Sequence, residues 1–449
     1  MAPTTGPGRI QLAGRTVQLG WLREHSTESA PLFARARAEV GHAWCLCRRP
    51  ALRLVIRCTR AGRYHVAGWP GEGERHDSHC PFHKLGPALS GRDRYSTQAI
   101  RETDDGVFIR LATPLTSTLA QPEPHVAAPE ETGDEAGSRR SVGLLGLLHW
   151  LWEQAQLNVS YPQTRRPTWH TCHARLHQQL RETTINGRGT EEALYVVPPF
   201  TPATAHANAA ALDVFRARLG RHGMTEQRAL ILGQIKEVAP TPYGVAYRLA
   251  HQRTPLYARA ALHARATRSY RHAFGKTAAE HGATRIALFV VERSPKGHLI
   301  AVDLAAMLTT GTFIPADSSY EVVMADALAA RRRAFVKPLR YDTADAVLPD
   351  FVLTDVTPTA YVEVYGIQGK ETYDRRKAEK QAFYQRQGGQ LIEWDVAQPL
   401  PVLALSGGQR RCGPQVVPRG QRAAASQTYG EEAVKDGTRM GHEQGGQSR

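Results

Sequence analysis

Two apolar runs near the C-terminal end of the chain decide the fold: LPDFVLTD at 348–355 and AYVEVYG at 360–366. The Lys-rich stretch YDRRKAEKQAFYQ follows at 373–385. The runs predict two neighbouring strands, over 351–353 and 361–365. Because side chains alternate along a strand, Glu363 shares one face of the second strand with Tyr361 and Tyr365. A carboxylate in such an apolar strand is costly unless a cation neutralises it. We therefore expect Asp350 and Glu363 to bind a divalent metal ion.

The flanking segments extend these strands into a larger unit. SSYEVVMADALAARRRAF, from 318, predicts a helix that begins at Ser318 or Ser319 with a hydroxyl cap and carries Glu321 in its first turn. We expect a strand around 338–341, a helix over about 372–387 that ends at two glycines, and a last strand at 390–394. The predicted order is helix, three strands, helix and strand.

This order resembles the core of the PD-(D/E)xK nuclease superfamily. The resemblance implies a restriction-endonuclease-like fold, with Mg²⁺ held by Asp350 and Glu363 and assisted by Glu321. The superfamily pattern has lysine two residues after the glutamate, where this chain has Tyr365. Several members carry that lysine on the following helix.

Here that helix offers Lys377 and Lys380, which share one helical face. Either ammonium group can reach the carboxylates to orient a nucleophilic water or to neutralise developing charge. The alternative is a solvated basic helix on a fold that binds nucleic acid without cutting it.

A second group of reactive residues lies near the N-terminus, where Cys45-Leu-Cys47 is followed by HDSHCPFHK at 76–84. Tetrahedral zinc takes four sulfur or nitrogen ligands, and three cysteines with one histidine are an ordinary structural set. We expect Cys45, Cys47, His76 and Cys80 to bind zinc. His79 and His83 are alternative fourth ligands, whereas Cys58 is expected to pack as a small hydrophobic residue.

Two amphipathic segments, 143–156 and 169–181, predict a pair of helices in the central region. They form either a helix-turn-helix or winged-helix unit, or a plain helical hairpin with solvated arginines. In the first case Arg165, Arg166 and Arg175 lie near phosphate groups.

Several motifs in combination resemble a bacterial family known only as a domain of unknown function, number 1173. They are the CxC and HxxxC pairs, LLHWLWEQAQLN, VPPF and the C-terminal runs quoted above, and together they span about 45–399. The resemblance implies frequent coding on plasmids and integrative elements. No activity comes with it.

Composition limits the classes of partner. The chain has 449 residues, with 57 Lys and Arg against 42 Asp and Glu, a net charge of +15 and a pI near 9.8. Such a charge favours polyanions, although an arginine-rich composition also arises in GC-rich genomes. No run of eighteen apolar residues and no secretory leader occurs, so we expect no membrane span. Six unevenly spaced cysteines are typical of a reducing cytoplasm.

The expected organisation is α/β (α+β), with these parts: a zinc-binding module at 1–112, a flexible linker at 113–141, a helical region at 142–200, a mixed α/β region at 201–315, the nuclease-like core at 316–400 and a disordered basic tail at 401–449. The predicted function is Mg²⁺-dependent nuclease-like processing of DNA from bacterial mobile elements. The alternative is a non-catalytic nucleic-acid-binding or scaffold factor in plasmid maintenance or transfer. The sequence does not fix the oligomeric state.

Overall fold

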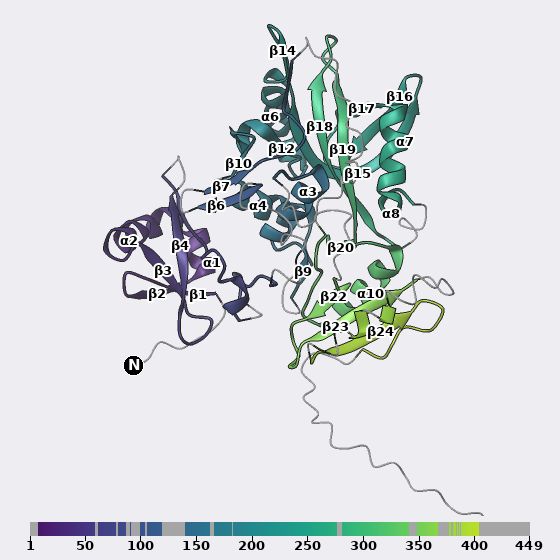
Figure 1. The fold of residues 1–449 in the computed structure, drawn as a ribbon. Helices are drawn as coiled ribbons and strands as arrows, with labels where there is room; N and C mark the ends of the chain where they lie inside the picture. Colours follow the sequence, from purple (N-terminus) through teal and green to yellow (C-terminus); the bar gives the residue numbers. More distant parts are fainter. Residues whose placement is uncertain are drawn as a thin grey trace, which may run out of the picture. The chain divides into compact units, whose positions relative to one another are not determined.

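The computed structural model describes residues 8–58, 62–77, 80–86, 90, 99–103, 106–118, 140–161, 166–181, 183–275, 281–340, 348–366 and 388–403, and the residues Lys377, Ala378, Lys380, Gln381, Ala382, Tyr384 and Arg386. These residues all belong to one compact unit, Met1–Ser406. Most of the predicted linker and nearly all of the predicted tail lie outside them. The described residues form five sheets with helices packed on them, a mixed α/β fold (Figure 1).

The N-terminal sheet is antiparallel and has the order β2-β1-β3-β4-β5. Its apolar side chains, among them Ile10, Leu54 and Ile56, pack against Phe33 of α2 in one cluster that also contains Cys45 and Cys80. The elements are β1 (Arg9–Leu12), β2 (Arg15–Gln18), α1 (Leu19–Glu24), α2 (Ser26–Glu39), β3 (His42–Cys45), β4 (Leu52–Cys58) and β5 (Tyr64–Gly68). The candidate zinc ligands are thus fixed to a small core of their own.

Two further small sheets join segments that the sequence analysis assigns to different parts. The first has the order β11-β10-β7-β6 and the second β13-β14-β8. Their strands are β6 (Ile100–Thr103), β7 (Gly106–Ile109), β8 (Thr116–Thr118), β10 (Thr183–Ile185), β11 (Arg188–Gly189), β13 (Gly220–His222) and β14 (Thr225–Gln227). Because β7 pairs with β10, the chain from Ile100 onward belongs with the central region, and the expected boundary at 112 is too late.

The two predicted central helices are present as α3 (Leu144–Gln154) and α4 (Trp169–Leu180). α3 is buried on almost every side, from Leu144 to Trp152, because it packs against β18 and β19 of the central sheet. One hydrophobic core runs from Ala99 to Leu339, so the expected boundary at 200 does not separate two cores. The remaining elements here are α5 (Thr190–Ala193), β12 (Leu194–Val196), η4 (Pro202–Thr204) and α6 (Ala205–Ala217).

Five strands of the central sheet close into a ring. The order is β15-β16-β17-β19-β18, and β15 completes the ring by pairing with β16 through its second half and with β18 through its first half. β17 and β19 are parallel and the other neighbours are antiparallel. The elements are β15 (Ala229–Thr241), β16 (Gly244–Leu249), β17 (Leu256–Arg259), α7 (Ala260–Ser269), α8 (Arg271–Phe274), β18 (Thr284–Arg293) and β19 (Leu299–Thr309), with β20 (Pro315–Ala316) beside β19.

The alternating pattern at 256–266 predicts a strand, but only its first four residues are extended. Ala260–Ser269 is helical, because alanine has a high helix propensity and Leu262 and Ala266 bury one helical face at a spacing of four residues. The alternation of small and basic residues in this stretch fits both the two-residue period of a strand and the 3.6-residue period of a helix. Burial against the ring decides between them.

The C-terminal sheet has the order β24-β23-β22-β21-β9. β21, β22 and β23 are antiparallel neighbours, and β24 is parallel to β23. The elements are α10 (Ser319–Ala330), β21 (Phe335–Val336), β22 (Phe351–Leu353), β23 (Ala360–Tyr365) and β24 (Gln390–Asp395), with β9 (Val159–Ser160) from the central region at one edge. β21 lies a few residues before the expected strand at 338–341.

α10 begins as the sequence predicts. The Ser318 hydroxyl accepts the N–H of Glu321 at 3.2 Å, so the helix starts at Ser319. Met324, Ala325 and Leu328 pack on the face of the sheet that carries Phe351 and Val362. Among the described residues, no helix combines the length and the hydropathy needed to cross a membrane.

Candidate active site and candidate metal centre

Asp350, the residue just before β22, lies opposite Glu363 of β23. The pairing of Phe351 with Val362 continues through the Asp350 N–H, which donates to the Val362 carbonyl at 3.1 Å. Directly opposed residues of an antiparallel pair project from the same face of a sheet. Both side chains are buried, Glu363 almost completely. The sheet therefore holds two carboxylates side by side, away from bulk water.

Helical residues after β23 cover Glu363. The Lys380 Nζ donates to one carboxylate oxygen at 2.7 Å, and the Tyr384 hydroxyl donates to the other at 2.5 Å. Tyr384 is fully buried and stacks on Tyr361, with ring centroids 4.7 Å apart. The Lys377 ammonium instead lies 4.2 Å from the centroid of the Tyr365 ring, a cation–π contact. Of the two lysines proposed from the sequence, the structure brings Lys380 to the carboxylates.

Asp350 is held by the backbone and is only partly neutralised. One of its oxygens accepts the Val364 N–H at 2.7 Å. Burial raises the pKa of Asp350 and Glu363 raises it further, although the charge of Lys337 acts in the opposite direction. Burial at this position therefore favours the protonated acid unless a cation lies close to it.

Lys337 is a member of this site that the sequence analysis missed. Its ammonium group lies 2.7 Å from a Glu321 oxygen and 2.9 Å from an Asp317 oxygen, and only 2% of its side chain is exposed. The ladder between β21 and β9 holds it in place, because Lys337 and Asn158 exchange hydrogen bonds of 2.8 and 2.9 Å. A lysine inside the apolar run AFVKPL at 334–339 was the signal available in the sequence.

Glu321 pairs with Lys337, and it does not complete a ligand set with the other two carboxylates. Among the described residues, the only three or more ligand atoms of His, Cys, Asp or Glu found within 4.8 Å of one another belong to the cysteine cluster described below. Burial raises the pKa of Glu321 to about 7, with a contribution from the charge of Asp350 and despite that of Lys337. Contrary to the prediction from the sequence, Glu321 is therefore not placed as a metal ligand with Asp350 and Glu363, and acts on Asp350 only as a neighbouring charge.

Arg340 adds a second buried positive charge near this group. Burial lowers the pKa of its guanidinium, but the charges of Asp317, Asp350 and Glu321 outweigh that effect and raise it. His149 of α3 donates a hydrogen bond to the Arg340 carbonyl and so ties the segment after β21 to the central core.

The predicted cysteine cluster is assembled in the N-terminal part. The Sγ atoms of Cys45 and Cys80 are 3.5 Å apart, and the Nδ1 of His76 lies 3.3 Å from Cys47 and 3.5 Å from Cys80. Zn–S bonds of about 2.3 Å place tetrahedral sulfur ligands about 3.8 Å apart. All four residues are buried. The geometry can hold a metal ion such as zinc.

Strand ends and turns place these ligands. Cys45 ends β3, and His76 directly follows the short helix η1 (Gly73–Arg75). Of the two candidate histidines that the structure describes, His76 and His83, His76 lies in the cluster. His79 lies outside the described residues, and His83 and the half-buried Cys58 are not in the cluster.

The three thiols compete for negative charge. Hydrogen bonds from Cys45 and Cys80 lower the pKa of Cys47, and the hydrogen bond with Cys47 raises the pKa of Cys45 to about 12. The pKa of Cys80 is also raised, first by its hydrogen bond with Cys45. A bound divalent cation removes this competition, because it stabilises all three thiolates together.

Two of the three arginines proposed to contact phosphates are described, and their surroundings differ. The Arg175 Nη1 donates to the Gln156 carbonyl at 3.2 Å and so secures the turn after α3. Arg166 is exposed, and Arg165 lies outside the described residues. α3 is a core helix, and α4 buries Trp169, Cys172, Leu176 and Leu180 along one face.

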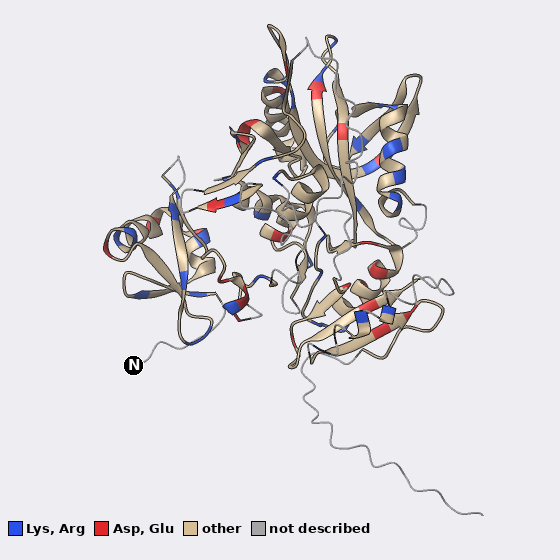
Figure 2. Cartoon of the chain, viewed as in Figure 1, with Lys and Arg blue, Asp and Glu red and all other residues tan. Residues whose placement is uncertain are grey.

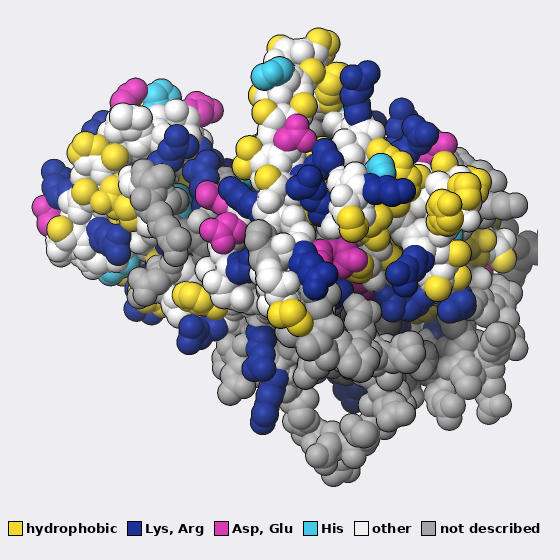
Figure 3. Space-filling model, turned by 90° about the horizontal axis from the view of Figure 1, so that it is seen from above, with side chains coloured by type: hydrophobic (Ala, Val, Ile, Leu, Met, Phe, Trp, Pro, Cys, Tyr) yellow, Lys and Arg dark blue, Asp and Glu magenta, His cyan; other side chains and the backbone are white. Residues whose placement is uncertain are grey.

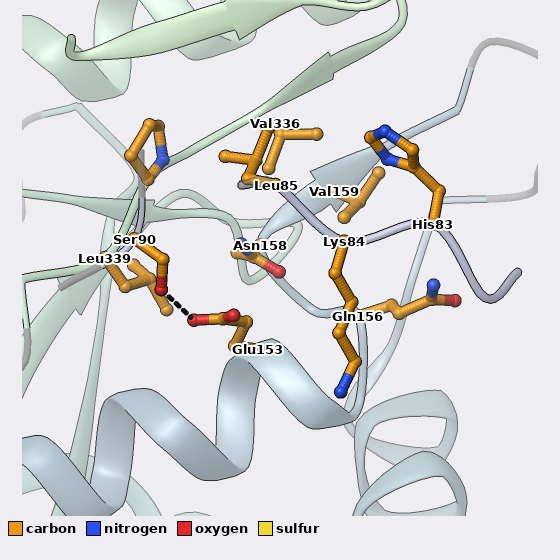
Figure 4. A pocket seen from close by; sticks show the side chains of 11 residues that line it. His83, Lys84, Leu85, Ser90, Glu153, Gln156, Asn158, Val159, Val336 and Leu339 are labelled. Atoms are coloured by element: carbon orange, nitrogen blue, oxygen red, sulfur yellow. Dashed lines mark hydrogen bonds between the residues drawn. The ribbon is translucent and has the colours of Figure 1, made fainter. Parts of the chain in front are cut away.

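The segment after Cys80 reaches the C-terminal sheet. Lys84 donates to Gln154 at 2.8 Å, and Leu85 packs against a small cluster that contains Val352, Tyr361 and Tyr384. A pocket of about 20 Å³ lies here, where Ser90 donates to Glu153 (Figure 4). It holds little more than one water molecule, so we assign it no ligand.

The chain belongs to the family described as protein of unknown function (DUF1173), whose model matches residues 16–397. No curated protein and no solved structure matches the chain.

We expect the purified full-length protein to contain about one zinc ion per chain. Cys80→Ser should lower the zinc content and the thermal stability, because a structural metal ion contributes directly to folding. Zinc is measured by inductively coupled plasma mass spectrometry. Cys58→Ser is the matched control and should keep the wild-type content. A wild-type protein free of zinc after purification without chelators would refute the site.

Lys337→Met should destabilise the protein by about 3–5 kcal/mol, because it leaves buried carboxylates without a counter-charge. The loss should be larger at pH 8 than at pH 5. Without the lysine, the pKa of Glu321 rises further above its ordinary value of 4.5, so folding favours the protonated acid and stability falls as the pH increases.

Urea unfolding at the two pH values measures both effects. The double variant Lys337→Met/Glu321→Gln should recover part of the loss, since the main uncompensated charge is gone. Equal losses at pH 5 and pH 8 would contradict the assignment.

Proposed function

We propose that the C-terminal part is a metal-dependent phosphodiesterase that cleaves nucleic acid. One observation carries the proposal: Asp350 and Glu363 face each other across β22 and β23, and Lys380 has its ammonium 2.7 Å from Glu363. Two carboxylates on one face of a sheet, with a lysine from the helical residues above them, form the set of groups that the PD-(D/E)xK resemblance implies.

The sheet topology supports the proposal. Helix α10, three antiparallel strands β21, β22 and β23, helical residues between Lys377 and Arg386, and the parallel strand β24 follow one another in the order expected for such a core. After the final crossover, Lys380 lies over the face that bears the two acids. A lysine on this helix can thus do the work of the lysine that Tyr365 replaces.

The donor set suits Mg²⁺. This ion prefers carboxylate oxygens and needs only one or two of them, because waters and substrate phosphates complete its shell. Asp350 and Glu363 would hold it, and the burial of Asp350 without full neutralisation favours a cation. When bound, the ion would supply a Lewis acid and a more acidic water.

The protein side chains have separate tasks in this proposal. Lys380 would neutralise charge on the phosphate oxygens or orient the attacking water, and Tyr384 would fix Glu363 through its hydrogen bond. Lys337 would be a positioning residue and would not contact the substrate. Its ammonium neutralises the carboxylates of Glu321 and Asp317 and holds the start of α10 against the end of β21.

One observation favours a second candidate, a nucleic-acid-binding protein that does not cut. Both Glu363 oxygens already accept hydrogen bonds, from Lys380 and Tyr384, so the carboxylate is satisfied by the protein itself. A metal ion at Glu363 must displace or share one of these donors. Retention of binding without cleavage would identify this case.

We expect Mg²⁺-dependent cleavage of DNA that Asp350→Asn and Glu363→Gln each reduce by at least about 100-fold. Lys380→Met should reduce the rate by about 100-fold or more, whereas Lys377→Met should have a clearly smaller effect, because the Lys377 ammonium meets the Tyr365 ring and not a carboxylate. Cleavage is measured on labelled single-stranded, duplex and branched DNA.

Asp326→Asn is the control, because it removes a carboxylate from the exposed side of α10. Absence of cleavage by the wild type with Mg²⁺ or Mn²⁺, together with DNA binding that survives both acid substitutions, would favour the non-catalytic protein.

A further inference from the structure

The closed ring of five strands has a distinctive connection order. Numbered within the ring, its strands pair as 1-2-3-5-4-1, strands 3 and 5 are parallel, and α7 lies between strands 3 and 4. This is the topology of the oligonucleotide- and oligosaccharide-binding (OB) barrel, whose second and third strands carry the ligand face. Topology alone assigns no ligand. The side chains on that face must do so.

The register of the strands shows which side chains point outward. Tyr247 of β16 points into the ring, where it contacts Phe289 and donates or accepts a 2.8 Å hydrogen bond with His263 of α7. The alternate residues of β16 and β17 therefore point outward. They are Gly244, Ala246 and Arg248 on β16 and Tyr257 and Arg259 on β17.

These outward residues form a shallow strip bordered by cations. Its middle row is Ala239, Ala246, Tyr257 and Ile300, which are neighbours across four strands. The small side chains of Ala246 and Ala239 beside Tyr257 make the surface shallow over β16 and β15. Arg259 and Arg248 lie two residues away from the row that contains Tyr257, on opposite sides of it. Two residues of a strand correspond to about 7 Å along the strand direction.

Aromatic groups stand at both ends of the strip. Tyr243 occupies the tip of the β15–β16 hairpin and is 91% exposed. At the other end, the His298 ring meets the Tyr257 ring edge to face, with centroids 5.5 Å apart. His298 ends the β18–β19 loop, which also carries the exposed Lys296. The two loops that flank the ligand face of an OB barrel thus bring a tyrosine and a lysine to it.

The ring carries a clear excess of positive charge. Residues 229–309 contain 11 Lys and Arg and 4 Asp and Glu, a net charge of +7 out of +15. Figure 2 shows Lys and Arg on α7 and the neighbouring strands β16 and β17. Figure 3 shows basic side chains set among hydrophobic ones on the face seen from above. Among the described residues, Arg248 has only an exposed partner, Glu237 at 3.6 Å, and Arg259 has no acidic partner.

We propose that the outer face of β16, β17 and β19, with Tyr243 and Lys296, binds single-stranded nucleic acid. Exposed rings offer stacking surfaces to unpaired bases, and the surrounding cations attract the phosphates. A duplex is a poorer ligand, because its base faces are already stacked and a strip one tyrosine wide cannot enter a groove as a helix does. The inference stands without the proposed catalysis, since the two surfaces use different residues.

Binding is tested on the full-length, zinc-loaded protein carrying Asp350→Asn, without added Mg²⁺, so that cleavage does not interfere. Fluorescence anisotropy reports the affinity for labelled oligonucleotides of about 15 nucleotides, a length that covers one barrel. We expect single-stranded DNA or RNA to bind at least about tenfold tighter than a duplex of the same length. Tyr243→Ala should weaken binding at least about fivefold, and Tyr243→Phe should bind within about twofold of the parent.

The double variant Arg248→Gln/Arg259→Gln should make the slope of log affinity against log salt shallower, by about 0.7 for each phosphate that the protein no longer neutralises. Arg37→Gln removes one positive charge from the exposed side of α2 and should leave this slope unchanged. Unchanged affinity in both Tyr243→Ala and the arginine double variant, or equal binding of duplex and single strand, would overturn the proposal. Failure of cleavage alone would leave it intact.

Discussion

Compensation of buried charge is the constraint on which the C-terminal part depends. Glu321, Asp350 and Glu363 are buried on three different elements, and the sheet is stable only if cations reach them. Lys337 arrives from the end of β21 and Lys380 from the helix beyond β23. The two lysines approach from opposite faces of the sheet, because Lys337 shares its face with Phe351 and α10, whereas Lys380 covers the face of Glu363. The ion pairs that stabilise the C-terminal sheet are therefore also the ones that build the candidate site.

Soft ligand atoms (sulfur) and hard ligand atoms (carboxylate oxygen) lie in different parts of the chain. Thiolates and one imidazole gather at the N-terminal sheet, where a closed set of four ligands leaves no open position for chemistry. Carboxylate oxygens gather at the C-terminal sheet, where the proposed Mg²⁺ ion would take its protein ligands from Asp350 and Glu363. Leu85 connects the two, since the loop after Cys80 packs beside Tyr361 and Tyr384. Order in the zinc loop can thus support the helix that carries Lys380.

A basic ring between these two sites gives the chain a consistent chemical character. A net charge of +7 over 229–309 is a much higher density than the whole chain shows, in keeping with the polyanionic ligand proposed above for the ring. A surface that holds single strands beside a phosphodiesterase centre would hold substrate near the reacting groups. Holding strands beside an inactive carboxylate site would serve a binding factor equally well, which is why cleavage and binding need separate measurements.

The sequence by itself determined the local features. Alternation placed Asp350 and Glu363 on neighbouring strands, the two serines at 318–319 marked the start of α10, and close spacing picked out Cys45, Cys47 and Cys80 with three candidate histidines, because strand period, capping and ligand spacing are all short-range properties. Only the tertiary structure decided which cation serves which acid, since Lys337 meets Glu321 across 16 residues and Lys380 meets Glu363 across 17. It also decided that 260–269 is helical and that five strands close into a ring. Pairing between distant segments depends on burial and register, which no short window of sequence contains.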